Sequence, residues 1–309
     1  MTPDWPGYLR LYESGELARR AEAARELLTP CTVCPRQCHA DRLAGRDCFC
    51  GGGALARVCS AGPHFGEERP LVGTGGSGTI FLVGCNLGCI FCQNYEISHG
   101  RGGTEVTAQQ LANTMLGLQA RGCHNINFVT PTHFVPQILA ALVPAVEGGL
   151  RLPLVYNSGG YDRPDTLRLL DGVFDIYMPD AKYADPEVAA RLSAARDYPQ
   201  VMRAALAEMH RQVGDLEIGP DGLARRGLLV RHLVLPGGLA GTPEIMRFLA
   251  LLSRDTYVNV MAQYRPCFRA HEHAELNRRI TVEEYRAAVQ AALDAGLHRL
   301  DERPLAFLR

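Results

Sequence analysis

Residues 84–94 read GCNLGCIFCQN and place Cys85, Cys89 and Cys92 at spacings of four and three residues. On a helix, side chains at these spacings share one face, so a buried stripe of thiols is one interpretation. Asn86 and Gly88 are poor helix formers, however, and a strand-like run over residues 79–83 comes directly before the stretch. The stretch is therefore expected to form a loop after a strand, where it can wrap a metal.

Thiolates in a short run are typical ligands of zinc and of iron-sulfur clusters. A closed zinc site uses four ligands, whereas this stretch supplies one Cys-x2-Cys pair and no fourth ligand nearby. Three thiolates on a four-iron cluster leave one iron open, and an open coordination position is what a catalytic metal site needs. We therefore predict a [4Fe-4S] cluster on Cys85, Cys89 and Cys92.

Strand-like and helix-like segments alternate from residue 78 onward. The expected strands cover residues 79–83, 125–129, 154–156, 174–177, 228–235 and 257–261. The expected helices cover residues 106–120, 135–146, 166–170, parts of 186–213, 243–252 and 282–295. Such alternation implies an α/β fold with a parallel sheet. Six units are too few for an eight-fold barrel, so we expect a partial (βα)6 TIM-like barrel or a doubly wound sheet, with the chemistry at the carboxyl ends of the strands.

The part before the first of these strands divides into two segments. Residues 7–28 carry leucines and alanines near helical spacing and are expected to form a helix. From residue 29 to about 70 there are six cysteines and several glycines but no long periodic run. We expect residues 1–70 to form an N-terminal helix and cysteine-rich metal-binding lobe, and residues 71–309 to form the core domain.

Nine of the eleven cysteines lie between residues 31 and 92. Thiols of an ordinary core would be scattered along the chain, so this clustering favours metal. The first group contains Cys31, Cys34, Cys38 and Cys48, with Cys50 close behind. A reduced, thiol-rich loop is one interpretation of this group. The other is a second site on Cys31, Cys34, Cys38 and Cys48, holding a structural zinc or an auxiliary iron-sulfur cluster.

Composition excludes several classes of protein. The chain has 309 residues, 47% of them hydrophobic, and can bury a large core. Its formal net charge is -1, so no overall basic field is available to hold nucleic acid or an anionic membrane. Residues 1–10 lack the apolar run of a signal peptide, and no later stretch reaches the length of a membrane span. We expect a cytoplasmic location, where disulfides are disfavoured.

The pattern Cys-x3-Cys-x-Phe-Cys after the first strand resembles the signature of radical S-adenosylmethionine enzymes. The resemblance implies a partial barrel of the radical SAM type in which the amino and carboxylate groups of S-adenosylmethionine (SAM) chelate the open iron. It also implies that the reduced cluster cleaves SAM to a 5'-deoxyadenosyl radical. Phe91 matches the aromatic position that packs near the adenine.

A longer pattern resembles an uncharacterised branch of that superfamily named pyruvate formate-lyase activating enzyme-like. The matching blocks cover most of the chain and are residues 92–98, 125–133, 155–161, 175–182, 231–237 and 261–264. The branch implies a glycyl radical enzyme as protein substrate and a reductant of the flavodoxin or ferredoxin type.

Each of these later blocks closes an expected strand, which places its polar residues where the cofactor would bind. Many relatives have a Gly-Gly-Glu segment after the second strand that binds the amino group of SAM. This chain has Thr130 and the following Pro-Thr-His there, so Thr130 is the expected contact, and His133 is either functional or a loop histidine. Asn157 and Ser158 could meet the ribose or carboxylate of SAM, or simply form a turn.

Two further sets of charged residues are expected to contact SAM. Asp180 and Lys182 match the Asp-x-Lys of the activating enzymes, which lies against SAM, with a surface ion pair as the alternative. On the fifth strand, Arg231 and His232 must face opposite sides. An inward Arg231 would need a carboxylate partner, such as that of the cofactor. Residues 263 and 264 are weaker candidates that could equally serve packing.

The leading hypothesis is a radical SAM enzyme that abstracts hydrogen from its substrate, a glycine of a partner enzyme according to the branch. Modification of a small molecule or a peptide is the alternative within catalysis. An electron-transfer protein without SAM is a different class, but electron carriers normally use four protein ligands for each cluster. A zinc-stapled scaffold would explain the N-terminal cysteines but not the polar residues at the strand ends.

Overall fold

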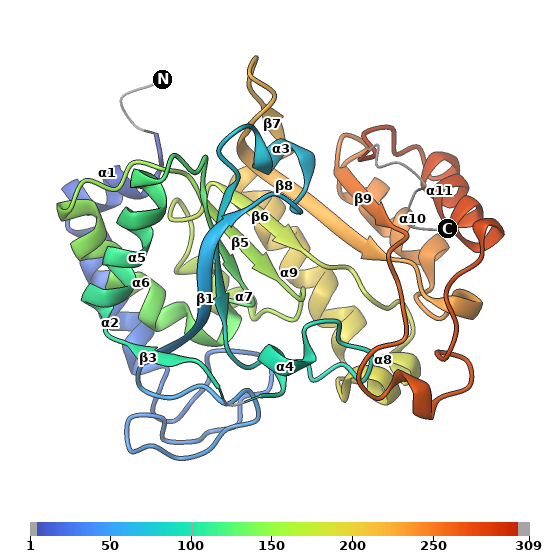
Figure 1. Ribbon diagram of the computed structural model, residues 1–309, viewed down its shortest axis with the longest axis horizontal. Helices are drawn as coiled ribbons and strands as arrows, with labels where there is room; N and C mark the ends of the chain where they lie inside the picture. The colour runs from blue at the N-terminus through green and yellow to red at the C-terminus, as the bar shows by residue number, and fades with distance from the viewer. Residues whose placement is uncertain (1–4, 101, 302–309) are drawn as a thin grey trace.

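Six parallel strands in chain order form the centre of the protein, in a computed structural model that describes residues 5–100 and 102–301 (Figure 1). They are β2 (Ser77–Leu82), β4 (Ile126–Val129), β5 (Leu154–Ser158), β6 (Ile176–Pro179), β8 (Ala224–Leu233) and β9 (Tyr257–Met261). Each pairs in parallel with the next. The predicted α/β fold with a partial barrel of six strand-helix units is confirmed.

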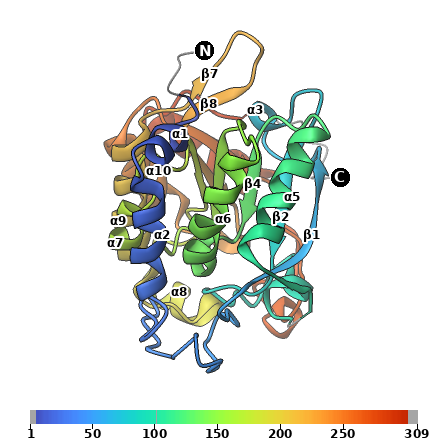
Figure 2. The ribbon, with the colours of Figure 1, turned by 90° about the vertical axis from the view of Figure 1, so that its left-hand side faces the viewer.

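Helices follow the parallel strands and cover the sheet (Figures 1 and 2). They are α5 (Ala108–Ala120), α6 (Val135–Glu147), α7 (Pro164–Arg168), α8 (Pro186–Ser193), α9 (Tyr198–Val213), α10 (Thr242–Leu252) and α11 (Val282–Asp294). Three short 3-10 turns, η1 (Thr132–Phe134), η2 (Pro236–Gly238) and η3 (Ala270–Glu272), lie in the connections. The first and last long helices begin with capping boxes, at Thr107 and Thr281, which satisfy free backbone N–H groups. None of the helices in the described part of the chain is long and apolar enough to cross a membrane.

Antiparallel strands at the two sides of the sheet were not expected from the sequence. β1 (Ala56–His64) pairs with β2, and β3 (Thr104–Val106) pairs with β1. β7 (Glu217–Ile218) pairs with β8, and the short helices α3 (Arg69–Val72) and α4 (Tyr95–Ser98) are also additional. Because β1 joins the sheet, the boundary expected at residue 70 does not coincide with a break in the sheet.

The N-terminal helix is two helices rather than one. α1 (Tyr8–Glu13) and α2 (Glu16–Glu26) are separated at Gly15, whose φ of 73° is left-handed and accessible to glycine without strain. α2 packs beside α6 (Figure 2). Residues 32–55 contain no helix or strand, and this blue segment lies beside α4 at the lower edge of the molecule in Figure 1.

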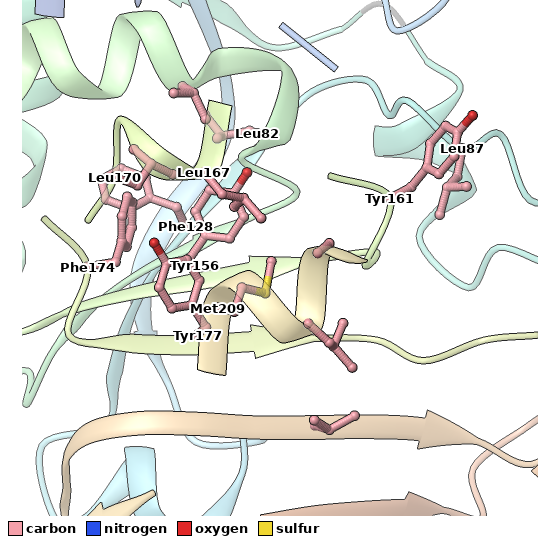
Figure 3. Close-up of a cluster of buried hydrophobic side chains, with 14 of the residues drawn as sticks. Leu82, Leu87, Phe128, Tyr156, Tyr161, Leu167, Leu170, Phe174, Tyr177 and Met209 are labelled. Carbon is pink, nitrogen blue, oxygen red and sulfur yellow. The ribbon is translucent and has the colours of Figure 1, made fainter. Parts of the chain in front are cut away.

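The core between the central strands and helices α7 and α9 is built on aromatic rings (Figure 3). Phe174 packs edge-on against Phe128 and Tyr156, with ring centroids 6.1 and 5.0 Å apart, and Tyr156 packs in the same way on Tyr177 at 5.6 Å. All four rings are buried. Such pairs contribute about 0.5–1.5 kcal/mol each beyond the burial of their surface. This packing holds β4, β5 and β6 together just below the carboxyl ends that carry the expected site.

Candidate cluster and cofactor site

The loop after β2 turns sharply at two glycines. Gly84 has a φ of +88° and Gly88 a φ of +72°, a region that side chains with a Cβ rarely adopt. Gly84 also has no room for a side chain, since a Cβ there would lie 2.0 Å from the carbonyl oxygen of Cys50. These turns place Cys85 and Cys89 within five residues of each other without forming a helix, as expected from the sequence.

Each of the three predicted cluster thiols accepts a hydrogen bond from a nearby donor. The donors are the Leu87 amide to Cys85 Sγ at 3.3 Å, the Ser193 hydroxyl to Cys89 Sγ at 2.9 Å and the Ser98 hydroxyl to Cys92 Sγ at 3.1 Å. Donors aimed at sulfur suit thiolates and tune the reduction potential of a cluster they hold. Ser98 and Ser193 were not predicted from the sequence, and Ser193 is 104 residues away from Cys89.

Burial favours the protonated thiols of Cys85 and Cys92 unless a cation binds them. It raises the pKa of Cys85 to about 12, and the neighbouring Cys89 adds to the shift. Burial also raises the pKa of Cys92, while the charge of Lys182 acts in the opposite direction. Metal binding requires thiolates, so the iron of a cluster would provide the charge that ionises them.

No three His, Cys, Asp or Glu side chains among residues 5–100 and 102–301 converge closely enough to hold a single ion. A four-iron cluster does not need such convergence, because each thiolate binds a separate iron.

Asp180, after β6, forms a buried ion-pair network with two cations. Its Oδ2 lies 2.5 Å from Lys182 Nζ, and its Oδ1 lies 2.8 Å from Arg231 Nε and Nη2. The side chains of Asp180 and Lys182 are only 13% and 17% exposed, so the pair is not a surface ion pair. Burial alone would raise the pKa of Asp180, but Arg231 and Lys182 hold it below its usual value.

Arg231 and His232 face opposite sides of β8, as the alternation of a strand requires. Arg231 lies on the same side as Asp180 and also donates to Asn157 Oδ1 at 2.8 Å. His232 is buried toward α10, with Nδ1 2.7 Å from the Ala181 carbonyl and Nε2 2.8 Å from the Thr242 hydroxyl. Asp180 is therefore the carboxylate partner that an inward Arg231 requires.

Two other expected contacts have backbone or loop roles in the structure. Thr130 has a φ of +59°, an outlier for a β-branched residue, and its N–H donates to the Asn157 carbonyl at 2.8 Å. The Ser158 hydroxyl donates to Asp162 Oδ2 at 2.6 Å and so stabilises the following turn. Contact of Thr130, Asn157 and Ser158 with SAM stays a prediction.

Aromatic and amide contacts attach the cysteine loop to the far side of the barrel. Phe91 is buried and packs edge-on against Tyr183 and Tyr264, with centroids 6.3 and 5.9 Å apart. The Gln93 side chain donates to the Gln263 carbonyl at 3.0 Å. The weaker candidates at residues 263 and 264 thus anchor the loop, and the contact of Phe91 with adenine stays a prediction.

Residues 79–223 match the family model of the Radical SAM superfamily. Over 283 residues the chain is 31% identical to Uncharacterized protein MJ0674 of Methanocaldococcus jannaschii, covering 88% of this chain and 77% of that protein. This chain belongs to the radical SAM superfamily. It is also similar to the cobalamin-dependent S-adenosylmethionine radical enzyme OxsB, with a TM-score of 0.39 and 11% identity over 72% of this chain. It spans only 31% of the OxsB chain.

As a radical SAM protein, the chain uses a [4Fe-4S] cluster and SAM as cofactors. The three hydrogen-bonded thiols at the carboxyl end of β2 fit the cluster, since they supply three ligands and leave one iron for SAM. Lys182 lies near enough to Cys89 and Cys92 for their charges to interact, which brings the network of Asp180 next to the radical SAM loop.

The first cysteine group lies directly against the radical SAM loop. Cys31, Cys34, Cys38 and Cys50 line one small cavity. Cys48 belongs to the predicted set of ligands, but it lies beside this cavity, with its Sγ 3.3 Å from Cys50 Sγ. Whether these thiols bind a metal is taken up below.

Proposed function

We propose that this protein reductively cleaves SAM at a [4Fe-4S] cluster held by Cys85, Cys89 and Cys92, and abstracts hydrogen from a substrate. The bound cluster supplies one electron to SAM, which yields methionine and a 5'-deoxyadenosyl radical. The observation that carries the proposal is the loop itself, in which every thiol accepts a hydrogen bond.

The residues at the strand ends would orient SAM beside the open iron. Lys182 uses one of its three N–H groups on Asp180 in the structure and has donors to spare for a carboxylate. Asp180 accepts from both Lys182 and Arg231 and fixes their positions, so the cations need little rearrangement when a ligand arrives. We infer that Asp180 and Lys182 bind the methionine part of SAM, and that Arg231 and Asn157 support them.

The proposed substrate is a glycine in a partner enzyme, from which the radical would take one hydrogen atom. This gives 5'-deoxyadenosine and a glycyl radical. The resemblance of the strand-end blocks to the activating-enzyme branch supports this substrate. An open cleft on the outer side of the cysteine loop also supports it, because a protein segment could approach there. The cleft is lined by Phe49, Ile90, His99, Phe268 and Arg269, among others. We further propose a flavodoxin- or ferredoxin-type protein as the electron donor.

The test is anaerobic reconstitution with iron and sulfide, reduction with dithionite, and measurement of 5'-deoxyadenosine and methionine. We expect equal amounts of both products from the wild-type chain and none from Cys85→Ala. Cys123→Ala, which changes a buried cysteine outside both groups, is the matched control and should retain cleavage. A reduced protein that carries its cluster and binds SAM but never cleaves it would disprove the proposal.

The glycine substrate has a separate test. Candidate partner enzymes are prepared with deuterium at the glycine Cα and incubated with the reduced protein and SAM. Deuterium in the 5'-deoxyadenosine, together with a glycyl radical signal, would support the activating role. Transfer of deuterium from a small molecule or a free peptide instead would favour the alternative reaction on the same cofactor site.

A further inference from the structure

Cysteines from both ends of residues 31–50 line one cavity. Cys31, Cys34, Cys38 and Cys50 line one cavity, and three of them are buried, at 3%, 5% and 6% exposure for Cys31, Cys34 and Cys50. Cys38 is exposed at its rim. Four thiols that line one cavity form a typical set of ligands for an iron-sulfur cluster, in which each thiolate binds a separate iron.

Among the residues that the structure describes, two guanidinium groups beside this cavity have no carboxylate partner. Arg42 is fully buried, donates to the carbonyls of His133 and Gly53, and lies 4.0 Å from Cys31 Sγ. Arg36 donates to four backbone carbonyls. Within residues 5–100 and 102–301, neither guanidinium forms an ion pair. A buried cation is costly unless an anion compensates it, so this cavity needs a negative charge that neutral thiols do not supply.

A metal held by four thiolates supplies that charge. A [4Fe-4S] cluster with four thiolates is anionic in its usual states, and its four thiolates need not converge on a single ion. His133 also lines the cavity; its Nε2 bonds the Val83 carbonyl at 2.9 Å, and its buried Nδ1 has no partner among the described residues. The two guanidinium groups and His133 beside the four thiols thus fit a charged occupant better than an empty thiol pocket.

We propose that Cys31, Cys34, Cys38 and Cys50 hold a second metal centre, an iron-sulfur cluster, whose negative charge is balanced by Arg42 and Arg36. The ligand set differs from the one predicted from the sequence by having Cys50 in place of Cys48. Cys48 Sγ instead lies 3.1 Å from the Gly52 carbonyl and beside Cys50 Sγ, outside the cavity lining.

The centre shares its walls with the radical SAM loop. Arg36, between two of the ligands, donates to the carbonyls of Asn86 and Leu87 at 2.8 and 3.1 Å. The carbonyl of Cys50 lies directly over Gly84, and the Phe49 ring lies over Gly88, where a Cβ would be 3.1 Å from the ring. The second centre therefore sets the position of the loop that holds the catalytic cluster.

The sharpest test compares two exposed cysteines of the full wild-type chain, Cys38 and Cys59. The protein is purified anaerobically from cells supplied with iron and zinc, alkylated with iodoacetamide under native conditions, and mapped by mass spectrometry. If metal protects Cys38, only Cys59 reacts quickly, and removal of the metal with a chelator makes Cys38 at least about tenfold more reactive. Burial cannot produce this difference, because both thiols are exposed.

Metal content of variants identifies the ligands and the metal. In the triple variant Cys85→Ala, Cys89→Ala and Cys92→Ala, we expect about four irons per chain to remain. Further change of Cys50→Ser should remove this metal, whereas Cys48→Ser should retain it. Iron that remains in the triple variant supports the cluster, whereas zinc in its place would overturn the proposal.

The proposal is overturned if Cys38 reacts as fast as Cys59 before and after chelation. It is also overturned if the folded triple variant holds no metal, or if the wild-type chain carries a Cys48–Cys50 disulfide and no metal beyond the catalytic cluster. Should the triple variant fail to fold, the alkylation of the wild-type chain decides the question. Loss of SAM cleavage has no bearing on this test, because neither readout depends on it.

Discussion

The two cysteine groups of this protein use the same side chain in opposite surroundings. In the loop of residues 84–94, each sulfur accepts a hydrogen bond, and Lys182 stands beside two of them next to polar residues at the strand ends. In the segment of residues 31–50, four of the cysteines and two arginines line one small cavity. The first arrangement can leave one iron for SAM, whereas the second is enclosed by its own ligands. The surroundings, not the cysteines, distinguish a catalytic site from a structural one.

The same comparison shows that the two groups are not independent. Arg36 connects them by donating to four carbonyls, those of Asn86, Leu87, Ser193 and Ala194, and its guanidinium lies 4.1 Å from the centre of the Phe49 ring. From sequence spacing alone, the groups are expected to belong to separate units. In the structure, the N-terminal segment forms one wall of the catalytic loop.

The largest effect is expected from the loop thiols. Cys85→Ala, Cys89→Ala or Cys92→Ala should each abolish SAM cleavage and remove the catalytic cluster, because no neighbouring side chain can replace the missing ligand. Cleavage and cluster absorbance are measured after anaerobic reconstitution. Cys59→Ala, on the exposed surface of β1, is the control. Retained cleavage in any of the three variants would contradict the ligand assignment.

A large loss of stability is expected from Asp180→Ala. The change leaves Lys182 and Arg231 buried without their anion, and breaking a buried pair in this way typically costs about 3–5 kcal/mol. Urea unfolding measures the difference. Asp221→Ala breaks an exposed pair with Arg225 and should cost about 1 kcal/mol or less. Equal losses of unfolding free energy in Asp180→Ala and Asp221→Ala would contradict the expected effect of burying the Asp180 ion pairs.

The ammonium group of Lys182 is expected to contribute to the binding of SAM. Lys182→Met keeps the aliphatic volume but removes the ammonium group, so we expect SAM to bind at least about tenfold more weakly, which corresponds to about 1.4 kcal/mol. The iron content should stay near that of the wild-type chain. Equilibrium dialysis with labelled SAM measures the affinity, and an unchanged affinity would remove Lys182 from the cofactor site.

The features that the sequence predicts are those whose residues lie close together along the chain. The six strand-helix units follow from local periodicity, and the cluster loop follows from three cysteines within eight residues. β1 was missed because its middle residues, 59–61, are exposed and show no alternation. The donors Ser98 and Ser193, the link through Arg36 and the choice of Cys50 over Cys48 depend on contacts in space that spacing does not encode.

A moderate effect is expected from Arg36, which connects the two groups. Arg36→Ala leaves the carbonyls of Asn86 and Leu87 without their donor, and we expect faster loss of iron from the catalytic cluster in the presence of a chelator. Arg36→Lys should restore part of the wild-type rate, since one ammonium group can reach only some of the carbonyls. Arg25→Ala, on an exposed face of α2, is the control. An unchanged rate of iron loss in Arg36→Ala would show that Arg36 does not couple the N-terminal cysteines to the catalytic cluster.

The smallest effect is expected from the hydroxyl donors. Ser98→Ala removes the hydrogen bond to Cys92 Sγ, which stabilises the more negative, reduced form of the cluster. The midpoint potential should therefore become more negative, with unchanged iron content. Spectroscopic redox titration measures the shift, and Ser14→Ala, at the distant end of α1, is the control. A shift toward more positive potential would contradict the role assigned to Ser98.

The most direct test of the central claim is the electron paramagnetic resonance spectrum of the reduced wild-type protein, recorded with and without SAM. If Cys85, Cys89 and Cys92 hold a cluster with one open iron, SAM should change the g values of the reduced cluster signal. The same change should appear in Cys59→Ala, and the responsive signal should be absent from Cys89→Ala. A reduced cluster whose spectrum is unaffected by saturating SAM, or a responsive signal that survives in Cys89→Ala, would contradict the account.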